Sequence, residues 1–281
     1  MKMPTFANKK EEIDFLVKNK SLLITEKKIN SNLKRQDEFI TIDSNLVSKS
    51  IAKETVKEDT EDVLYRDLII NTTNYMDSHS DVHLSKIWNK SLSEKKDRYH
   101  VKEHDLSFNG VITYSKDIEA FVKAFTWKEL GYNVEGTTEA LVYSVAIQKN
   151  VNKEMFDLYL KNIVKQHSVR MQYIKIEMAV NDEDYKEEFA TWNKYISEIV
   201  NSEKAIEQGY FFAVTEAKEI EGSAVLMGSN PITPTIENKQ DNETALIERI
   251  KFYEPNFSLK NLNEPIKPQT KDEDNLYLLT I

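Results

Sequence analysis

The sequence predicts an α+β domain over residues 63–235, flanked by an N-terminal extension over 1–62 and a polar tail over 236–281. Two observations predict this class. Short runs rich in Val, Ile and Leu, typical of strands, alternate with segments whose apolar residues recur at helical spacing. The hydrophobic content of 40% is enough for a core, whereas both ends are polar and charged.

The N-terminal extension is rich in Lys, Glu, Asn and Ser. Its apolar runs at 22–24 and 39–42 are candidates for short strands that could belong to the following domain. The highly charged stretch 48–62 is interpreted as a flexible or helical link.

Within the domain, three kinds of pattern define the expected elements. Runs of β-branched residues predict strands at 63–73, 111–114, 140–147 and 171–178. Helical spacing predicts helices at 115–130, closed by Gly131, at 152–168, capped by Asn152, and at 182–208. Two further apolar runs, 210–215 and 220–227, are expected to form a terminal hairpin. The tail beyond residue 235 carries spaced prolines and is expected to be mostly disordered.

Composition excludes several function classes. The net charge of −9 argues against nucleic acid as the main partner, because phosphate binding needs clustered Lys and Arg. The absence of cysteine excludes disulfides, thiolate metal sites and a cysteine nucleophile. No apolar run approaches the ~18 residues that span a membrane, and the first residues lack the apolar stretch of a signal peptide. We therefore expect a soluble, intracellular protein with no membrane partner.

The chain has five histidines, and two pairs of them are spaced i, i+4: His79 with His83, and His100 with His104. On helices each pair would share one face, which is the geometry of a metal site. The turn-forming residues at 77–81 argue against helices, and no Glu follows in a metalloprotease arrangement. Histidines in solvated loops are the favoured interpretation of His79, His83 and His100.

Three residues are candidates for acyl-transfer chemistry. His104 lies at the edge of a predicted strand, where rigid backbone can hold a general base. Ser168 lies at a predicted helix-to-strand junction, where free amides could hold an oxyanion, although a serine there is also a common cap. Glu221 lies in an apolar strand and either faces solvent or orients an imidazole. His167 is not the base for Ser168, because adjacent side chains in extended backbone point to opposite faces.

Four segments, in this order along the chain, carry a family resemblance. They are Asp77 to Leu92, with Asp81-Val82, Trp88 and Ser91-Leu92; His104-Asp105 followed by Gly110; Leu158 to Tyr173; and Ile220 to Pro231. Together they resemble the prohead (capsid maturation) proteases of tailed bacteriophages, relatives of the herpesvirus assemblins. The match covers about residues 77–231. Two positions depart from the family pattern: Arg170 replaces a usual Gly, and Gly228-Ser229 replaces a common Pro-Ala.

The resemblance implies an assemblin-like β-barrel core wrapped by helices, and a serine endopeptidase that needs no cofactor. The family's catalytic histidine corresponds to His104, its nucleophile to Ser168 and its acidic residue to Glu221, with Glu219 as the second candidate acid. Arg170 is a candidate helper for oxyanion donors on the backbone beside Ser168.

The resemblance also implies partners and a place of action. The expected substrates are the phage scaffolding protein, scaffold-like segments of the major capsid protein, and the enzyme itself. The expected location is the assembling procapsid in the host cytoplasm, and the resemblance is compatible with a homodimer. Two alternatives stay open: a non-catalytic scaffold or capsid-assembly protein, favoured by the polar ends, and a metal-dependent hydrolase using His79, His83, His100 and His104.

Overall fold

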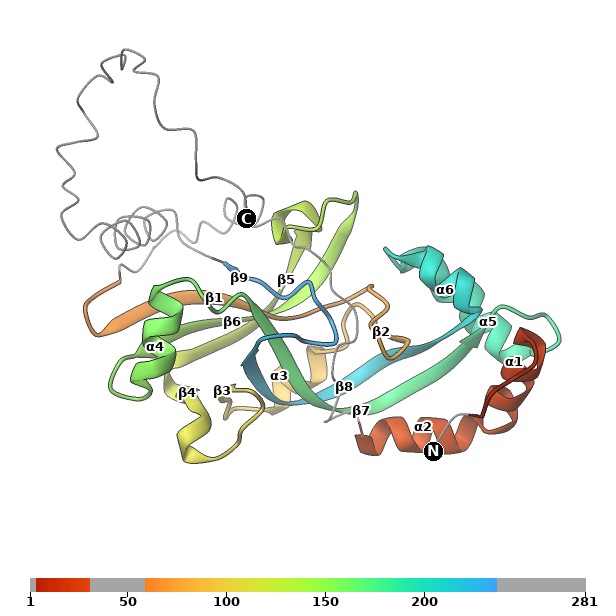
Figure 1. The fold of residues 1–281 in the computed structure, drawn as a ribbon, viewed down its shortest axis with the longest axis horizontal. Coiled ribbons are helices and arrows are strands. Elements are labelled where there is room, and N and C mark those ends of the chain that lie inside the picture. Colours follow the sequence, from red (N-terminus) through yellow and green to blue (C-terminus); the bar gives the residue numbers. More distant parts are fainter. Residues whose placement is uncertain (1–3, 31–58, 237–281) are drawn as a thin grey trace, which may run out of the picture.

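The computed structural model describes residues 4–30 and 59–236, and these form a mixed α+β fold with two sheets (Figure 1). The first sheet is antiparallel, in the order β5-β6-β1-β9. Its strands are β1 (Val63–Thr72), β5 (Ile118–Thr126), β6 (Thr137–Gln148) and the short β9 (Thr235–Ile236). The predicted α+β class is confirmed.

The second sheet is built on one long hairpin. Its strands are β7 (Gln166–Val180), β8 (Tyr210–Val225), β2 (Asp81–His83), β3 (His100–Lys102) and β4 (Val111–Thr113). β7 pairs antiparallel with β8 along nearly its whole length. The other edge of β8 is shared by two short parallel strands, β2 at residues 212–214 and β3 at 222–224, and β4 pairs with β3. Three separate chain segments therefore meet on β8.

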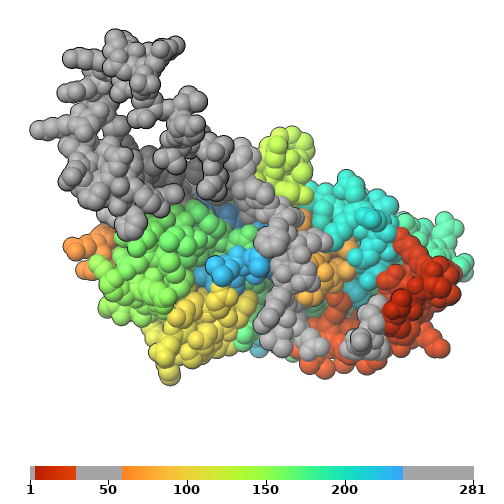
Figure 2. Space-filling model, viewed as in Figure 1, coloured from red at the N-terminus to blue at the C-terminus, as the bar shows by residue number. Residues whose placement is uncertain are grey.

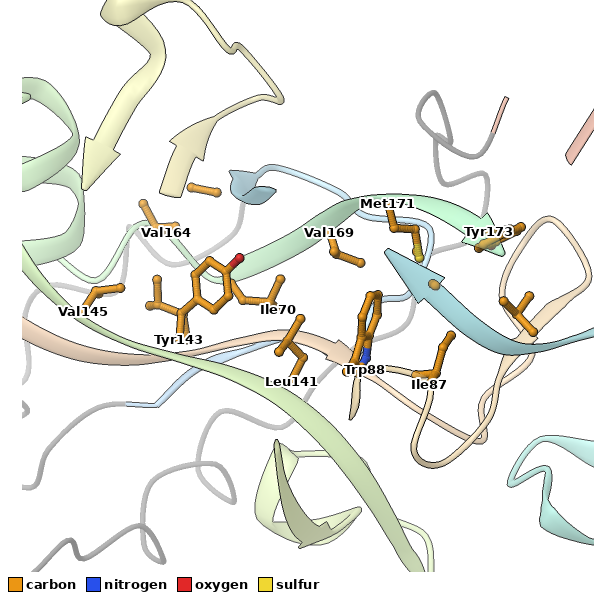
Figure 3. Packing of buried hydrophobic residues seen from close by; sticks show 14 of the residues in the cluster. Ile70, Ile87, Trp88, Leu141, Tyr143, Val145, Val164, Val169, Met171 and Tyr173 are labelled. Carbon is orange, nitrogen blue, oxygen red and sulfur yellow. The ribbon is translucent and has the colours of Figure 1, made fainter. Parts of the chain in front are cut away.

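The core lies where the two sheets pack together (Figure 3). Side chains from β1 and β6, such as Ile70 and Tyr143, meet Val169 and Met171 from the inner face of β7. The C-terminal segment links the sheets, because Pro234 accepts a hydrogen bond from Ile69 of β1 and forms a bridge with Gln166 of β7.

The expected closed barrel is not present among residues 4–30 and 59–236, whose strands stay in two sheets. Proline has no N–H to donate, so the ladder at Pro234 cannot continue as a regular strand pair. The link between β1 and β7 is consequently a short bridge.

Among the described residues, four helices lie around the end of the β7–β8 pair where the chain passes from β7 to β8, and two others pack elsewhere on the sheets. α1 (Lys9–Lys18), α2 (Lys20–Asn30), α5 (Lys186–Tyr195) and α6 (Ser202–Gln208) lie around this end of the pair, α3 (Asn89–Glu94) packs on β8, and α4 (Lys153–Leu160) packs on the first sheet (Figure 1). Residues 22–24 therefore lie in a helix, not in a strand as predicted. In the part of the chain that is described, no helix is both long and apolar enough to cross a membrane. The predictions for 39–42, for most of 48–62 and for nearly all of the tail lie outside the described residues.

Two predicted helices are wrong or too long. Residues 118–126 form β5, paired with β6 from Ile118↔Val145 to Thr126↔Thr137, because this ladder outweighs a helical spacing of apolar residues. Gly131 closes a 3₁₀ turn after β5. Asn152 caps α4 as predicted, but the helix ends at Leu160, and Ser168 lies inside β7.

The expected helix at 182–208 is divided into α5, a 3₁₀ turn at 196–198 and α6. The expected hairpin at 210–227 is one continuous strand, β8, whose true hairpin partner is β7. The error follows from the charged residues Glu216, Lys218 and Glu219, which divide the apolar run in the sequence but are paired with β7 in the structure.

Two histidines predicted in solvated loops are buried. His83 lies in β2 and His100 in β3, with 3% and 0% of their surfaces exposed, while His79 is half-buried. His100 shares the core between the sheets with His167. Burial, and for His100 also the neighbouring His167, lowers the pKa of His100 to about 3 and that of His167 to about 4.

We expect the free energy of unfolding to fall as the pH is lowered below about 6.5. Both imidazoles are neutral in the folded state and take up protons near their ordinary pKa of about 6.5 once the chain unfolds. Their contribution is therefore present above pH ~6.5 and is lost as the pH falls toward the folded pKa values, by about 1.4 kcal/mol per pH unit for each histidine.

Urea unfolding at pH 7.5, 6.5 and 5.5 measures this slope. His100→Gln and His167→Gln should each remove about half of it. Equal free energies of unfolding at pH 7.5 and 5.5 in the wild type would contradict the burial of two neutral histidines.

Candidate active site

The pairing register of β7 with β8 determines which side chains share the face of the candidate site. Ser168 lies directly opposite Ser223, and Arg170 lies opposite Glu221. Because residues opposite each other across a ladder share a face, these four side chains belong to one face of the hairpin. Val169, between Ser168 and Arg170, and His167, just before Ser168, belong to the other face, which packs into the core.

A strained turn brings His104 over this face. β3 runs parallel to β8 with Val101 opposite Ser223, and it ends at Lys102. Glu103 and His104 then take φ values of 48° and 59°, two successive left-handed residues that are not glycine. Such residues cost about 1–3 kcal/mol each and persist only where their surroundings hold them.

Hydrogen bonds from two strands hold the turn. The N–H of Glu103 donates to the carbonyl of Ala224 at 2.9 Å, and the N–H of His104 donates to Ser223 Oγ at 2.8 Å. Arg170 Nη2 donates to the carbonyl of His104 at 2.7 Å. Both backbone groups of His104 are thus bound by side chains of β7 and β8.

Gly110 is required for the chain to return to β4. A Cβ at Gly110 would lie 2.0 Å from the carbonyl oxygen of Asp105, so no larger residue fits without moving the turn. This close approach gives a physical reason for the glycine that follows His104-Asp105.

His104 and Glu221 form the closest pair of the site. His104 Nδ1 lies 2.5 Å from Glu221 Oε1, with 23% of the histidine side chain exposed and none of the glutamate. An ionised carboxylate only accepts hydrogen bonds, so Nδ1 carries the proton. Nε2 is left as the nitrogen able to accept a proton.

Arg170 supplies positive charge beside this buried carboxylate. Its Nε lies 3.6 Å from Glu221 Oε1, and neither this Nε nor Glu221 Oε2 has a hydrogen-bond partner within the described ranges. A buried carboxylate needs such compensation. Arg170, expected as a helper for oxyanion donors, instead holds the carbonyl of His104 and lies near Glu221.

Ser168 and Ser223 differ although they are opposite each other. Ser223 is fully buried, and its hydroxyl accepts from His104 and donates to the carbonyl of Val101 at 3.1 Å. Ser168 is half-buried, and its hydroxyl makes no hydrogen bond within the described residues. Ser168 is therefore the serine whose hydroxyl is available for chemistry.

A small cavity with a mixed polar and apolar lining, which includes Ile70, Val169 and Met171, lies against Ser168. Its volume is about 10 Å³, room for about one water molecule. Asn71, His83, Asn230 and Thr233 line it together with Ser168. Figure 2 shows the end of the described chain, in blue, beside the yellow part of the chain that holds β3 and β4. There the N–H of Leu226 donates to Glu103 Oε1.

The second candidate acid, Glu219, has other partners. It is buried against Lys95 Nζ at 2.9 Å and Arg98 Nε at 3.2 Å, and it accepts from the Tyr143 hydroxyl. The structure thus brings His104 to Glu221 directly and Ser168 to the same face through the register, while Glu219 lies in a separate ion-pair cluster.

The four histidines of the metal-site alternative do not gather. Among residues 4–30 and 59–236, no group of three or more His, Asp or Glu side chains is arranged to hold a metal ion. His83 and His100 are each bonded to a tyrosine hydroxyl in the core.

Ser223 is not among the site residues that the sequence predicts. A signal was present, because a residue two positions after Glu221 in a strand shares its face. The role of Ser223 in binding the N–H of His104 depends on the left-handed turn, which sequence pattern does not show.

Comparisons of the chain with protein-family profiles, with curated proteins and with solved structures gave no match. A half-buried imidazole, a serine hydroxyl without a hydrogen-bond partner in the described part of the chain, and a buried carboxylate bonded to the imidazole are the components of general-base and nucleophilic catalysis.

The two opposed serines should respond differently to loss of the hydroxyl. Ser223→Ala leaves the N–H of His104 without its acceptor, so we expect a loss of about 1–3 kcal/mol in the free energy of unfolding. Ser168→Ala removes a hydroxyl without such a partner and should change stability by less than about 0.5 kcal/mol. Urea unfolding of both variants measures the difference; equal losses would contradict the assigned roles.

Proposed function

We propose that the protein is a serine endopeptidase in which Ser168 is the nucleophile, His104 the general base and Glu221 the acid that orients the imidazole. The 2.5 Å contact between His104 Nδ1 and Glu221 Oε1 is the observation that carries the proposal, since it leaves Nε2 free to accept a proton. The register that puts Ser168 on the same face supports it.

In the proposed reaction, Ser168 Oγ attacks the carbonyl carbon of the scissile peptide bond while His104 Nε2 takes the hydroxyl proton. Backbone N–H groups beside Ser168 would hold the oxyanion. His104 then gives the proton to the leaving amine, the C–N bond breaks and an acyl-enzyme remains. A water molecule, deprotonated by His104, attacks the acyl carbon, and the free acid and Ser168 are released. No cofactor takes part.

The substrate and setting in this proposal come from the resemblance to prohead proteases. The substrates would be phage scaffolding protein, scaffold-like segments of the major capsid protein and the chain itself, inside a procapsid that assembles in the host cytoplasm. The same proposal includes a homodimer and a fold that is related to that of the assemblins. The link that residues 233–236 make between the two sheets supports the latter.

A fluorophosphonate probe should label the wild type at Ser168, because the probe reacts with serines activated by a base. Ser168→Ala should lose labelling, and incubation should shorten the wild type but leave Ser168→Ala at full length. Ser93→Ala, which removes an exposed hydroxyl in α3, is the matched control and should label like the wild type.

Labelled peptide mapping identifies the modified residue. Equal trimming of the wild type and Ser168→Ala would show that Ser168 is not the nucleophile. If the wild type is neither labelled nor trimmed, even within assembled procapsids, the alternative of a non-catalytic scaffold or capsid-assembly protein is favoured.

Substitution of Glu221 should lower activity, whereas substitution of Glu219 should mainly lower stability. Glu221→Gln keeps the shape of the side chain but removes the charge that holds the His104 tautomer, so we expect a loss of about 10²–10⁴-fold in labelling rate. Glu219→Gln should destabilise the fold by about 1–3 kcal/mol, through its Lys95, Arg98 and Tyr143 partners, and label within a few-fold of the wild type. The opposite order would transfer the acid role to Glu219.

A further inference from the structure

One tyrosine hydroxyl lies between two histidines behind the candidate site. Tyr159, in the last turn of α4, has its hydroxyl 2.7 Å from His100 Nε2 and 3.0 Å from His167 Nε2. All three side chains are buried, with 1% or less of each residue exposed. The proposed mechanism uses none of them.

Each histidine is bonded on its other nitrogen to the backbone of the site. His100 Nδ1 is 3.1 Å from the carbonyl oxygen of Gly222, and His167 Nδ1 is 3.0 Å from that of Thr233. Carbonyl oxygens only accept, so both Nδ1 atoms carry hydrogen.

These contacts reach all three strands that carry the site. His100 begins β3, which leads into the turn at His104; Gly222 lies between Glu221 and Ser223 on β8; and His167 directly precedes Ser168 on β7. By the strand registers, His100, Gly222 and His167 share the inner face of the sheet, while Ser168 and Glu221 belong to the outer one.

The hydroxyl proton of Tyr159 supplies one of the two Nε2 atoms with a donor. With both Nδ1 atoms protonated, each neutral imidazole offers Nε2 as an acceptor, and the Tyr159 O–H donates to one of them. Burial raises the pKa of Tyr159 well above its usual value, partly offset by Arg66, so the hydroxyl keeps its proton. Without the hydroxyl, the Nε2 atom that accepts this proton loses its donor inside the buried core, a penalty that small shifts of the strands would relieve.

We propose that Tyr159 is a positioning residue that fixes β3 and β7 relative to β8, and thereby holds His104 and Ser168 in register with Glu221. The inference rests on the proposed function, because it assigns a role in that reaction. Tyr159 does not touch the reacting atoms; it acts through His100 and His167. A displacement of about 1 Å at a reacting group can cost about 100-fold in rate.

The test compares two buried tyrosines that each bond a histidine. Tyr159→Phe removes the hydroxyl behind the site. Tyr173→Phe removes one that bonds His83 Nε2 and Asp81 Oδ2, each at 3.0 Å, and that makes no hydrogen bond to His100 or His167 among the described residues. We expect the fluorophosphonate labelling rate to fall about 10- to 100-fold in Tyr159→Phe and by less than about 3-fold in Tyr173→Phe. Unfolding midpoints of both variants check that stability losses are comparable.

A second readout follows the site without activity. The short hydrogen bond from His104 Nδ1 to Glu221 should give a low-field proton NMR resonance, assigned by its absence in His104→Gln. This resonance should shift or broaden in Tyr159→Phe and stay unchanged in Tyr173→Phe. If Tyr159→Phe does not fold, His167→Gln, which releases only β7, takes its place in the labelling measurement.

The outcomes separate the two proposals. Labelling of the wild type together with an equal labelling rate in Tyr159→Phe overturns the positioning role and leaves the proposed function intact. A wild type that is not labelled at Ser168 overturns the proposed function. In that case an unchanged His104 resonance in Tyr159→Phe overturns the positioning role as well, and a shifted one supports it.

Discussion

The left-handed turn at Glu103 and His104 is the constraint on which the site depends. Two successive residues with positive φ cost about 1–3 kcal/mol each, and the chain adopts them only because both backbone groups of His104 are bound from neighbouring strands. Those bonds come from Ser223 and Arg170, which flank Glu221 on the outer face of the hairpin. The hydrogen bonds of Ser223 and Arg170 that stabilise the left-handed turn therefore also place the His104 imidazole beside the Glu221 carboxylate.

The two faces of the second sheet differ in function: one carries the candidate site and the other packs into the core. The outer face presents Ser168, Arg170 and Glu221, and the inner face packs the same strands against β1 and β6. Gly222 makes this possible, since a Cβ there would lie 2.7 Å from the ring of Tyr143 and 3.1 Å from Ile70. Close packing on the inner face and strand register on the outer face are thus set by the same three residues, 221–223.

Sequence pattern predicted some parts of this arrangement and missed others for identifiable reasons. The cap at Asn152, the strands at 63–73 and 140–147 and the grouping of His104 with Glu221 came from local signals and from family resemblance. The helix expected at 115–130 failed because pairing with β6 outweighs helical spacing. His83, which follows the turn formers at 77–81, and His100 were expected in solvated loops, whereas both are buried in strands that pair with β8.

The sequence by itself determined the α+β class, the residue types available for chemistry and the absence of any cysteine-based site, because composition and local periodicity carry that information. Only the tertiary structure decided which acid meets His104, which of two opposed serines keeps an unpaired hydroxyl and where the buried histidines lie. These outcomes depend on the register of β7 on β8 and on a backbone turn of unfavourable φ. Both are set by contacts between residues more than 50 positions apart in the chain, such as His104 with Ser223 and Arg170.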